Sequence, residues 1–267
     1  MKPNLIFDLG LHKGEDTEFY LKKGFNVVAV DADPQLCEAA TEKFRNYVKS
    51  GQLHIVNRAI AEKAGVITFY RTSTSEWGTV KYDWVERNIR KGQKPLEKVS
   101  VKSIQIDSLI EQFGVPYYLK IDIEGMDIAA LKGIRDTISK PKYISIESDK
   151  VSFSALRNEF AILLDYGYTE FKIVQQENVS KQKPPRIAAE GVFAEHNFLR
   201  GSTGLFGAEL PGEWVTAEEA LEKYKSIFLR YHLTGDDPLI KSSKLLLILR
   251  KILGHPGWYD THARRVD

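Results

Sequence analysis

The segment Leu119-Lys120-Ile121-Asp122-Ile123-Glu124-Gly125 joins a buried strand to two carboxylates at its end. Residues 117–123 are mostly apolar, and an ordinary apolar core has no means of solvating the two acids that follow. In an extended segment, Asp122 and Glu124 point to the same side. Ligands of open α/β sheets bind beyond the carboxyl ends of the strands, so this pair marks a candidate functional site. The alternative is a strand-end Asp followed by a Glu that caps the next helix.

Strand and helix patterns alternate on both sides of this segment. The expected strands are 5–10, 26–31, 53–57, 66–70, 99–106, 117–123, 143–147 and 169–174, with 191–194 as a candidate last core strand. The expected helices are 14–21, 34–48, 107–110, 126–134, 153–166, 218–232 and 243–253. This order predicts an α/β protein with a doubly wound, Rossmann-like sheet and a C-terminal helical extension.

Length and composition set the domain organisation and the setting. We expect one catalytic domain over residues 1–212 and a helical extension over 213–267 that packs on the domain or on a partner subunit, which allows a homo-oligomer. A net charge of +2 gives no global attraction to nucleic acid, so no nucleic-acid partner is expected. The lone Cys37 excludes an internal disulfide framework, and no secretory signal precedes the first strand. We therefore expect a cytoplasmic protein.

The loop after the first strand has the spacing of a nucleoside site. Asp8, Gly10 and Gly14 lie between a strand and a helix, and Asp31 ends the next strand where an acid meets the hydroxyl pair of a ribose. Two ordinary turn glycines are the alternative interpretation of Gly10 and Gly14.

The same loop favours one nucleoside ligand over another. A dinucleotide fold needs further glycines close to the pyrophosphate, but His12 and Glu15 occupy those positions. S-adenosylmethionine carries no phosphate, and Asp8 can pair with its ammonium group. S-adenosylmethionine therefore ranks above NAD as the expected cofactor.

Four motifs together resemble the FkbM-type methyltransferases: 8–14, 28–34, 119–125 and 131–133. The resemblance covers roughly the first two-thirds of the chain, and residues 257–263 are similar to the tails of some members. It implies a Rossmann-like methyltransferase fold and O-methylation of a small-molecule or sugar hydroxyl.

The resemblance also implies a set of cofactor-binding residues. The residues expected to bind S-adenosylmethionine are Asp8, Gly10, Gly14, Thr17, Asp31, Ala32, Asn57, Ala59 and Asp122. Among them, Asp8 and the two glycines line the methionine part, Asp31 binds the ribose, and the residues from Asn57 to Ala59 lie near the adenine.

Methyl transfer from a sulfonium requires an aligned acceptor and the removal of a proton. A positioned base contributes about 10²- to 10⁴-fold in rate, and the candidates are Asp122, Glu124, Glu147 and His196. The three acids are alternatively ligands for a divalent cation such as magnesium, which would activate the hydroxyl. The sequence leaves base and metal open, and it contains no dense His and Cys spacing typical of zinc.

Acceptor specificity is expected in residues 72–79 and 195–214, where residue identity does not define one ligand. The last helix, residues 243–253, is basic and amphipathic, so it either packs on protein or lies on a membrane surface. The leading hypothesis is an S-adenosylmethionine-dependent O-methyltransferase. Its rivals are a nicotinamide-dependent oxidoreductase and a non-catalytic nucleoside-binding protein.

Overall fold

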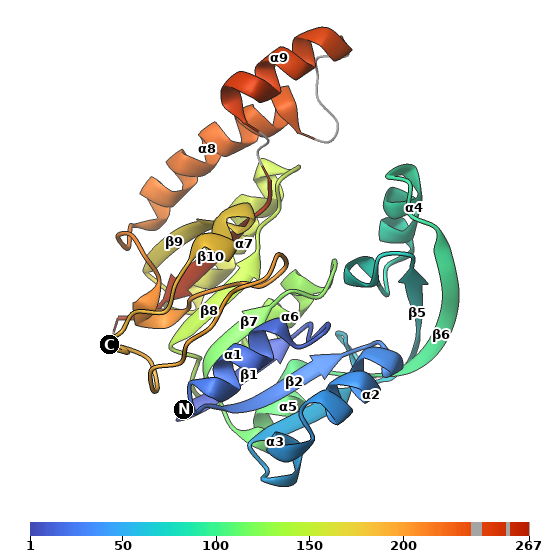
Figure 1. The fold of residues 1–267 in the computed structure, drawn as a ribbon, viewed down its shortest axis with the longest axis vertical. Coiled ribbons are helices and arrows are strands. Elements are labelled where there is room, and N and C mark those ends of the chain that lie inside the picture. The colour runs from blue at the N-terminus through green and yellow to red at the C-terminus, as the bar shows by residue number, and fades with distance from the viewer. Residues whose placement is uncertain (236–241, 255–256, 267) are drawn as a thin grey trace.

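The computed structural model describes residues 1–235, 242–254 and 257–266, and its largest feature is a seven-stranded sheet (Figure 1). The strands, in their order across the sheet, are β3 (Leu53–Asn57), β2 (Asn26–Asp31), β1 (Lys2–Leu9), β7 (Pro116–Ile121), β8 (Tyr143–Glu147), β10 (Tyr259–Arg264) and β9 (Glu170–Gln175). Neighbouring strands are parallel except at β10, which runs antiparallel to both β8 and β9. The predicted doubly wound α/β sheet is confirmed.

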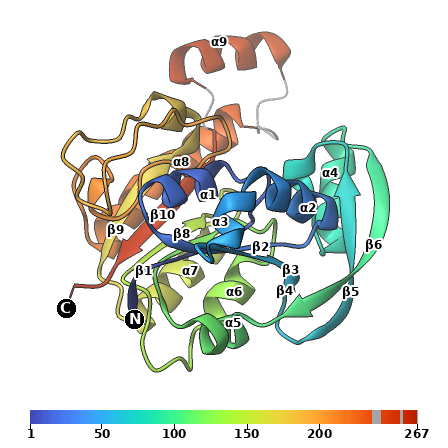
Figure 2. The ribbon, with the colours of Figure 1, turned by 60° about the horizontal axis from the view of Figure 1, so that its bottom comes forward.

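Helices cover both faces of this sheet (Figure 2). They are α1 (Glu15–Lys22), α2 (Pro34–Lys43) and α3 (Arg45–Lys49) on one face, and α5 (Ile106–Phe113), α6 (Asp127–Gly133) and α7 (Phe153–Asp165) on the other. Helix α8 (Ala217–Thr234) shares the core of the α5–α7 face. Side chains alternate between the faces, so that Ile6 packs with the α1 side and Phe7 with the α5 side. The helix expected over 34–48 is divided at Phe44, which ends α2 and precedes α3.

Residues 176–216 complete the α1 face without a long helix. Phe206 stacks on Tyr118 of β7 at 4.9 Å between ring centroids, so this segment forms part of the core. It contains 3₁₀ turns at Gln176–Lys181 and Gly207–Glu209. The strand expected at 191–194 is wrong, because the described chain there has no strand and the side chains of Val192 and Phe193 are exposed.

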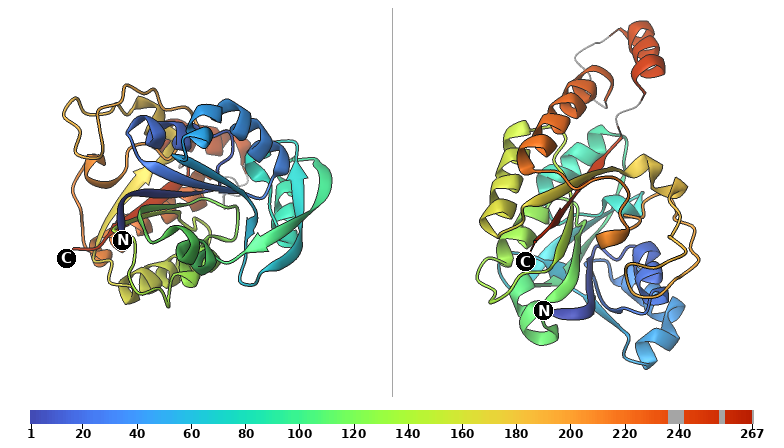
Figure 3. Two further views of the ribbon diagram at one scale, coloured as in Figure 1. Left: turned by 90° about the horizontal axis from the view of Figure 1, so that it is seen from below. Right: turned by 90° about the vertical axis from the view of Figure 1, so that its left-hand side faces the viewer.

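A second, three-stranded sheet stands beside the main one (Figure 3, left). It consists of β4 (Ala59–Ile60), β6 (Pro95–Ile104) and β5 (Gly65–Thr72) in that order. The strands expected over 66–70 and 99–106 pair with each other in this sheet and do not join the main one. A 3₁₀ turn (Ser75–Trp77) and α4 (Tyr82–Arg90) connect β5 to β6.

The C-terminal part contains the two expected helices, α8 and α9 (Ser243–Leu253), and α9 packs against α8 beyond the end of the main sheet (Figure 3, right). After α9, the chain returns to the main sheet as β10, a strand that we did not predict from the sequence. The division of the chain at residue 212 stays a prediction. Within the described residues, no helix is long and apolar enough to cross a bilayer.

Candidate active site

The first turn of the site lies where the direction of winding changes, between β1 and β7. Gly10 has φ +92°, and a Cβ atom at this position would lie 1.8 Å from the carbonyl oxygen of Asp122. The backbone of Asp122 in turn donates to the carbonyl of Leu9 at 3.0 Å. Only glycine permits this approach, which brings the β1–α1 loop against the end of β7.

A cavity of about 1200 Å³ lies beyond these strand ends. It is lined by seven residues that the sequence nominated: Gly10, Asp31, Ala32, Ala59, Asp122, Glu124 and Glu147. We call the part formed by Asp31, Asp122, Glu124 and Glu147 the carboxylate edge. The edge combines the ends of β2, β7 and β8, as expected for parallel strands.

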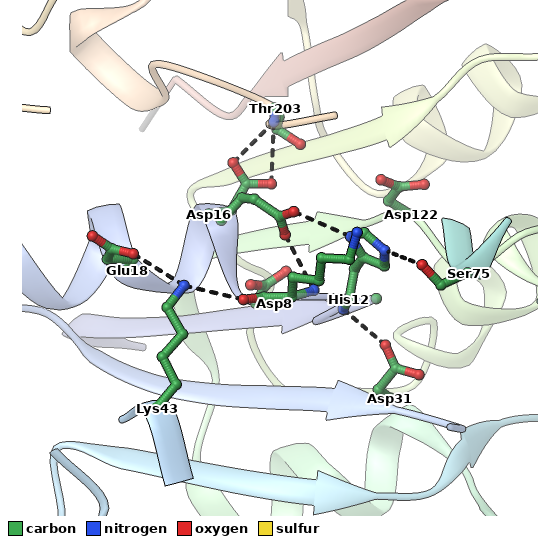
Figure 4. A network of polar contacts seen from close by, with 12 residues as sticks. Asp8, His12, Asp16, Glu18, Asp31, Lys43, Ser75, Asp122 and Thr203 are labelled. Atoms are coloured by element: carbon green, nitrogen blue, oxygen red, sulfur yellow. Dashed lines mark hydrogen bonds and ion pairs between the residues drawn. The ribbon is translucent and has the colours of Figure 1, made fainter. Parts of the chain in front are cut away.

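At the end of β2, the backbone fixes the carboxylate of Asp31 (Figure 4). The N–H of His12 donates to one oxygen at 2.9 Å and the N–H of Asp33 donates to the other at 2.8 Å. Burial raises the pKa of Asp31 to about 6. Asp33 accepts from the N–H of Gln35 and caps α2, as its position before Pro34 indicates.

Beneath the cavity, a buried lysine joins the acids of several elements. The Lys120 ammonium, on β7, donates to Asp8 at 2.9 Å and to the carbonyl of Gly10 at 3.0 Å. It also lies 3.4 Å from Asp16 and 3.9 Å from Asp122. The sequence signal was available, since a lysine in the middle of an apolar strand requires a partner. We had given it no role.

Lys120 changes the expected role of Asp8. This carboxylate is fully buried, accepts from both Lys120 and the Thr17 hydroxyl, and does not line the cavity. The structure therefore does not bring Asp8 or Thr17 to the cavity, and their contact with the cofactor stays a prediction. Gly14, with φ +77°, begins α1 against the ring of Phe44 and does not line the cavity either.

Asp122 and Glu124 reach the cavity through a turn, and the expected extended conformation is wrong. Strand β7 ends at Ile121, and Glu124 has φ +43°, in the left-handed region. The Asp127 carboxylate holds the turn by accepting from the N–H groups of Ile123 and Gly125 at 3.1 and 3.0 Å. Both acids nevertheless line the cavity.

The three acids at the end of β7 and β8 differ in their counter-charges. Arg87 lies 3.4 Å from Glu124, and Lys150 lies 3.0 Å from Glu147. Among the described residues, the one cation paired with Asp122 is Lys120, at 3.9 Å, and the Asp122 side chain is 40% exposed. Burial in this acidic cavity raises the pKa of Asp122 to about 7, against the opposing effect of Lys120, and burial also raises the pKa of Glu124.

Residues 74–91 close the cavity opposite the edge, and we call this segment the Trp84 wall. The Trp84 ring packs on Gly125, where a Cβ atom would lie 2.8 Å from it, and the Arg87 guanidinium stacks 3.7 Å from the centre of that ring. The Thr79 hydroxyl donates to the carbonyl of Glu124 at 2.8 Å. The wall is therefore attached directly to the turn that carries the acids, and it includes most of the 72–79 segment in which acceptor specificity is expected.

Strand β10 brings one more acid that the sequence analysis missed. Asp260 pairs in register with Glu147 on β8, and opposite residues of an antiparallel pair project on the same side. Burial raises the pKa of Asp260 well above its usual range. The neighbouring Gly257 and Trp258 line the cavity.

Two nominated residues have other positions. The side-chain amide of Asn57 donates to the carbonyls of Asp31 and Ala32 at 3.1 and 3.2 Å, so it fixes the loop after β2 and does not line the cavity. His196 is not brought to the cavity either: its ring packs on Phe19 and Phe198, with centroids 5.1 and 5.0 Å away. Burial lowers the pKa of His196.

The cation alternative assigned Asp122, Glu124 and Glu147 to magnesium. Among the residues that the structure describes, no three His, Cys, Asp or Glu side chains are arranged as a metal site. The geometry thus gives the magnesium hypothesis no support.

The lining of the cavity suits the polar groups and the charge of S-adenosylmethionine. Each oxygen of Asp31 retains a free acceptor site after its backbone bond, as a ribose hydroxyl pair requires. Ala59 and Ile60 give an apolar surface beside it, and Glu15 and Asp16 line the part next to Gly10. Acids suit a cationic tail and disfavour a pyrophosphate, so the residues fit S-adenosylmethionine and disfavour a dinucleotide.

Comparison with known proteins gives one family and a set of distant structures. A family model described as the methyltransferase FkbM domain matches residues 8–170. A search of curated proteins finds no match. Solved structures that are similar include a SAM dependent methyltransferase from Archaeoglobus fulgidus, with 12% identity, 98% of this chain and 86% of that chain covered, and a TM-score of 0.39.

Two further solved structures are equally distant. They are StiE O-MT, with 10% identity, coverage of 98% and 68%, and a TM-score of 0.40, and a precorrin-6y C5,15-methyltransferase from Geobacter metallireducens, with 12% identity, coverage of 73% and 75%, and a TM-score of 0.37. Similarities at this level carry no argument about the substrate.

Proposed function

Since the chain belongs to the FkbM methyltransferase family and is thereby an S-adenosylmethionine-dependent methyltransferase, we propose that it methylates a hydroxyl of a sugar, a glycan or another small molecule. When bound, S-adenosylmethionine supplies an electrophilic methyl group. The observation that carries the proposal is the Asp122 carboxyl, which opens into the same cavity as Asp31 and has a pKa raised to about 7. A base with that pKa suits proton removal from a hydroxyl near neutral pH.

Asp122 is the proposed base because the other two acids are closer to cations. Glu124 and Glu147 each pair with a basic side chain, Arg87 at 3.4 Å and Lys150 at 3.0 Å, whereas Lys120 lies 3.9 Å from Asp122. Asp122 also directly follows the strand that meets Gly10, so it lies between the donor side and the wall. In this proposal, Glu124 and Glu147 hold acceptor hydroxyls by hydrogen bonds.

The donor is proposed to bind along the β1 and β2 ends. Asp31 binds the ribose hydroxyls, and Ala32 and Ala59 lie against the adenine. The backbone of Gly10 admits the methionine part, and Asp16 is proposed to receive its ammonium in place of Asp8. Asp16 is oriented for this by accepting from the N–H of Thr203 at 2.9 and 3.1 Å.

The acceptor is proposed to be a saccharide because of the composition of the cavity. Three of the four tryptophans of the chain, Trp77, Trp84 and Trp258, line it together with carboxylates. Indole rings offer flat apolar surfaces to the C–H faces of a sugar ring, and carboxylates accept from its hydroxyls. The cytoplasmic location, the absence of a nucleic-acid partner and a homo-oligomeric state stay predictions.

The test has two stages. S-adenosylhomocysteine at about 100 times its Kd should add about 2.7 kcal/mol of stability and raise the Tm by several degrees, whereas NAD should not. Asp31→Ala should abolish the shift, and Glu62→Ala, an exposed acid outside the cavity, should retain it. Labelled S-adenosylmethionine and an acceptor library should then give a product methylated on oxygen. A product methylated only on nitrogen or carbon, or stabilisation by NAD alone, would overturn the proposal.

A further inference from the structure

Helix α9 presents an apolar stripe to solvent. Leu245, Ile248 and Ile252 occupy positions i, i+3 and i+7, which lie along one side of a helix. Their exposed fractions are 45%, 55% and 71%. Exposed aliphatic side chains in a continuous row, unlike single exposed ones, mark a surface that contacts something apolar.

Basic side chains border this stripe. Lys244 precedes Ile248 by four residues and Lys251 follows it by three, so both lysines are one turn from it on the exposed surface. The helix also carries Arg250 and no acid. Long lysine side chains beside an apolar row can bury their stems while their ammonium groups stay in water.

Arg250, on the side of α9 opposite the stripe, fixes the orientation of the helix. The Arg250 guanidinium donates to the carbonyls of Thr234 and Gly235 at 2.9 and 2.7 Å, which attaches α9 to the end of α8. The helix thereby lies beyond the main sheet (Figure 1). Leu246 and Leu249 are more buried than the residues of the stripe. The stripe is left facing away from the body that Arg250 contacts.

We propose that α9 docks on an anionic lipid surface, with Leu245, Ile248 and Ile252 in the acyl boundary and Lys244 and Lys251 among the headgroups. The charge beside the stripe selects this occupant, because anionic headgroups complement the two exposed lysines, Lys244 and Lys251, on a helix that carries no acid. A second copy fits less well, since a twofold contact would place the lysines of both helices near one another. An interfacial helix of this kind lies on a bilayer and does not cross it.

The docked helix would also orient the catalytic cavity, and this consequence rests on the proposed function. Arg250 lines the cavity from the α9 side, as Tyr231 does from α8. Arg250 and the stripe lie on opposite sides of α9, so a bilayer bound to the stripe would lie on the far side of α9 from the cavity. Docking would thereby fix the orientation of the cavity relative to the membrane.

The test is co-sedimentation of the full chain with vesicles of phosphatidylcholine alone and of phosphatidylcholine mixed with phosphatidylglycerol. Binding is expected only to the anionic vesicles and should weaken as salt is added. Lys244→Gln with Lys251→Gln should reduce the partition coefficient about thirty-fold, from about 1 kcal/mol for each basic residue. Ile248→Ser with Ile252→Ser should reduce it at least tenfold.

Ile187→Ser is the matched control, because Ile187 is also highly exposed but lies in the 176–216 segment. It should bind as the parent does, and all variants should keep the parent Tm shift with S-adenosylhomocysteine. Failure of the parent to bind anionic vesicles would overturn the proposal, as would binding of both α9 variants with the parent's partition coefficient. So would a concentration-dependent dimer in sedimentation that Ile248→Ser with Ile252→Ser dissolves, since a second copy would then cover the stripe. Stabilisation by S-adenosylhomocysteine, which tests the proposed function, is measured independently of vesicle binding.

Discussion

The carboxylate edge and the Trp84 wall face each other across one cavity, but they are held in place by different means. Asp31 ends β2 and Asp122 directly follows β7, and the backbones of both strands are bonded on both sides. The wall is attached to the edge side of the cavity mainly through side chains: Ser75 to His12, Thr79 to Glu124 and Arg87 to Glu124. A region fixed by a sheet can hold reacting groups to the tolerance that chemistry requires, whereas a region held by side chains can adapt to a ligand. We therefore expect turnover to depend on the edge and acceptor selection on the wall.

The largest expected effect is that of Asp122→Asn, which keeps the shape of the edge and removes its base. Turnover should fall about 10²- to 10⁴-fold, because a positioned base contributes that much. The parent rate should rise with pH and level off above about 7, since Asp122 must lose its proton to act and burial raises its pKa to about 7. The variant should lack this rise. The measurement is kcat against pH with an acceptor found by the library screen.

Binding of S-adenosylhomocysteine is the control for Asp122→Asn, and it should change by no more than a few-fold. Two results would break the assignment. One is an Asp122→Asn variant with the turnover of the parent. The other is a Thr79→Val variant, with Asp122 intact, whose turnover falls as far as that of Asp122→Asn.

The edge was largely predictable because its signals are local. An apolar run ending in an acid marks the end of a buried strand, and parallel strands bring such ends together, so Asp31, Asp122 and Glu147 were placed correctly from spacing alone. The spacing of residues along the sequence does not predict which of these acids pairs with a buried cation. Asp8 has the same strand-end pattern, yet Lys120 lies more than one hundred positions away in the sequence and neutralises it.

The wall and β10 were predicted poorly because the partners that define them are distant. The second sheet arises from pairing between β5 and β6, which residues 73–94 separate. The hydrophobic pattern of either strand does not indicate which sheet the strand joins. Strand β10 lies inside the sheet, but Asp260, Thr261 and His262 give it no apolar run. The Thr261 hydroxyl bonds to those of Ser148 and Tyr224, and these partners make a buried polar strand acceptable.

A smaller effect is expected from Arg87→Met, which tests the wall. The change should raise the KM for the acceptor about tenfold, because a guanidinium that stacks on Trp84 and pairs with Glu124 is lost from the acceptor side. It should leave kcat and S-adenosylhomocysteine affinity within a few-fold of the parent. Arg87→Lys should give an intermediate KM, since the charge remains while the planar stacking is lost. A loss of kcat comparable with that of Asp122→Asn would show that the wall takes part in the chemistry and would erase the distinction between the two regions.

The smallest expected effect concerns stability, and it follows from acids buried behind the edge. Glu159 accepts from the Ser148 hydroxyl at 2.8 Å, and burial raises its pKa from 4.5 to about 8. Between these values the folded state keeps a proton that the unfolded state releases, so stability falls as pH rises through this window. Glu159→Gln removes that loss, and its unfolding free energy should gain on the parent by about 1.4 kcal/mol per pH unit within the window.

The pH dependence of stability that Glu159 causes can be distinguished from that of His262, which has the opposite sign. Burial lowers the pKa of His262 to about 3, which reduces stability as pH falls below its ordinary value of 6.5. That slope is common to parent and variant, so the difference between their urea unfolding curves isolates Glu159. Glu76→Gln removes an exposed carboxyl from the wall instead, and its curve should run parallel to that of the parent because water solvates this group in both states. If Glu159→Gln also ran parallel to the parent from about pH 5 to about pH 8, Glu159 would not be held protonated behind the edge, and its contrast with the exposed Glu76 of the wall would be lost.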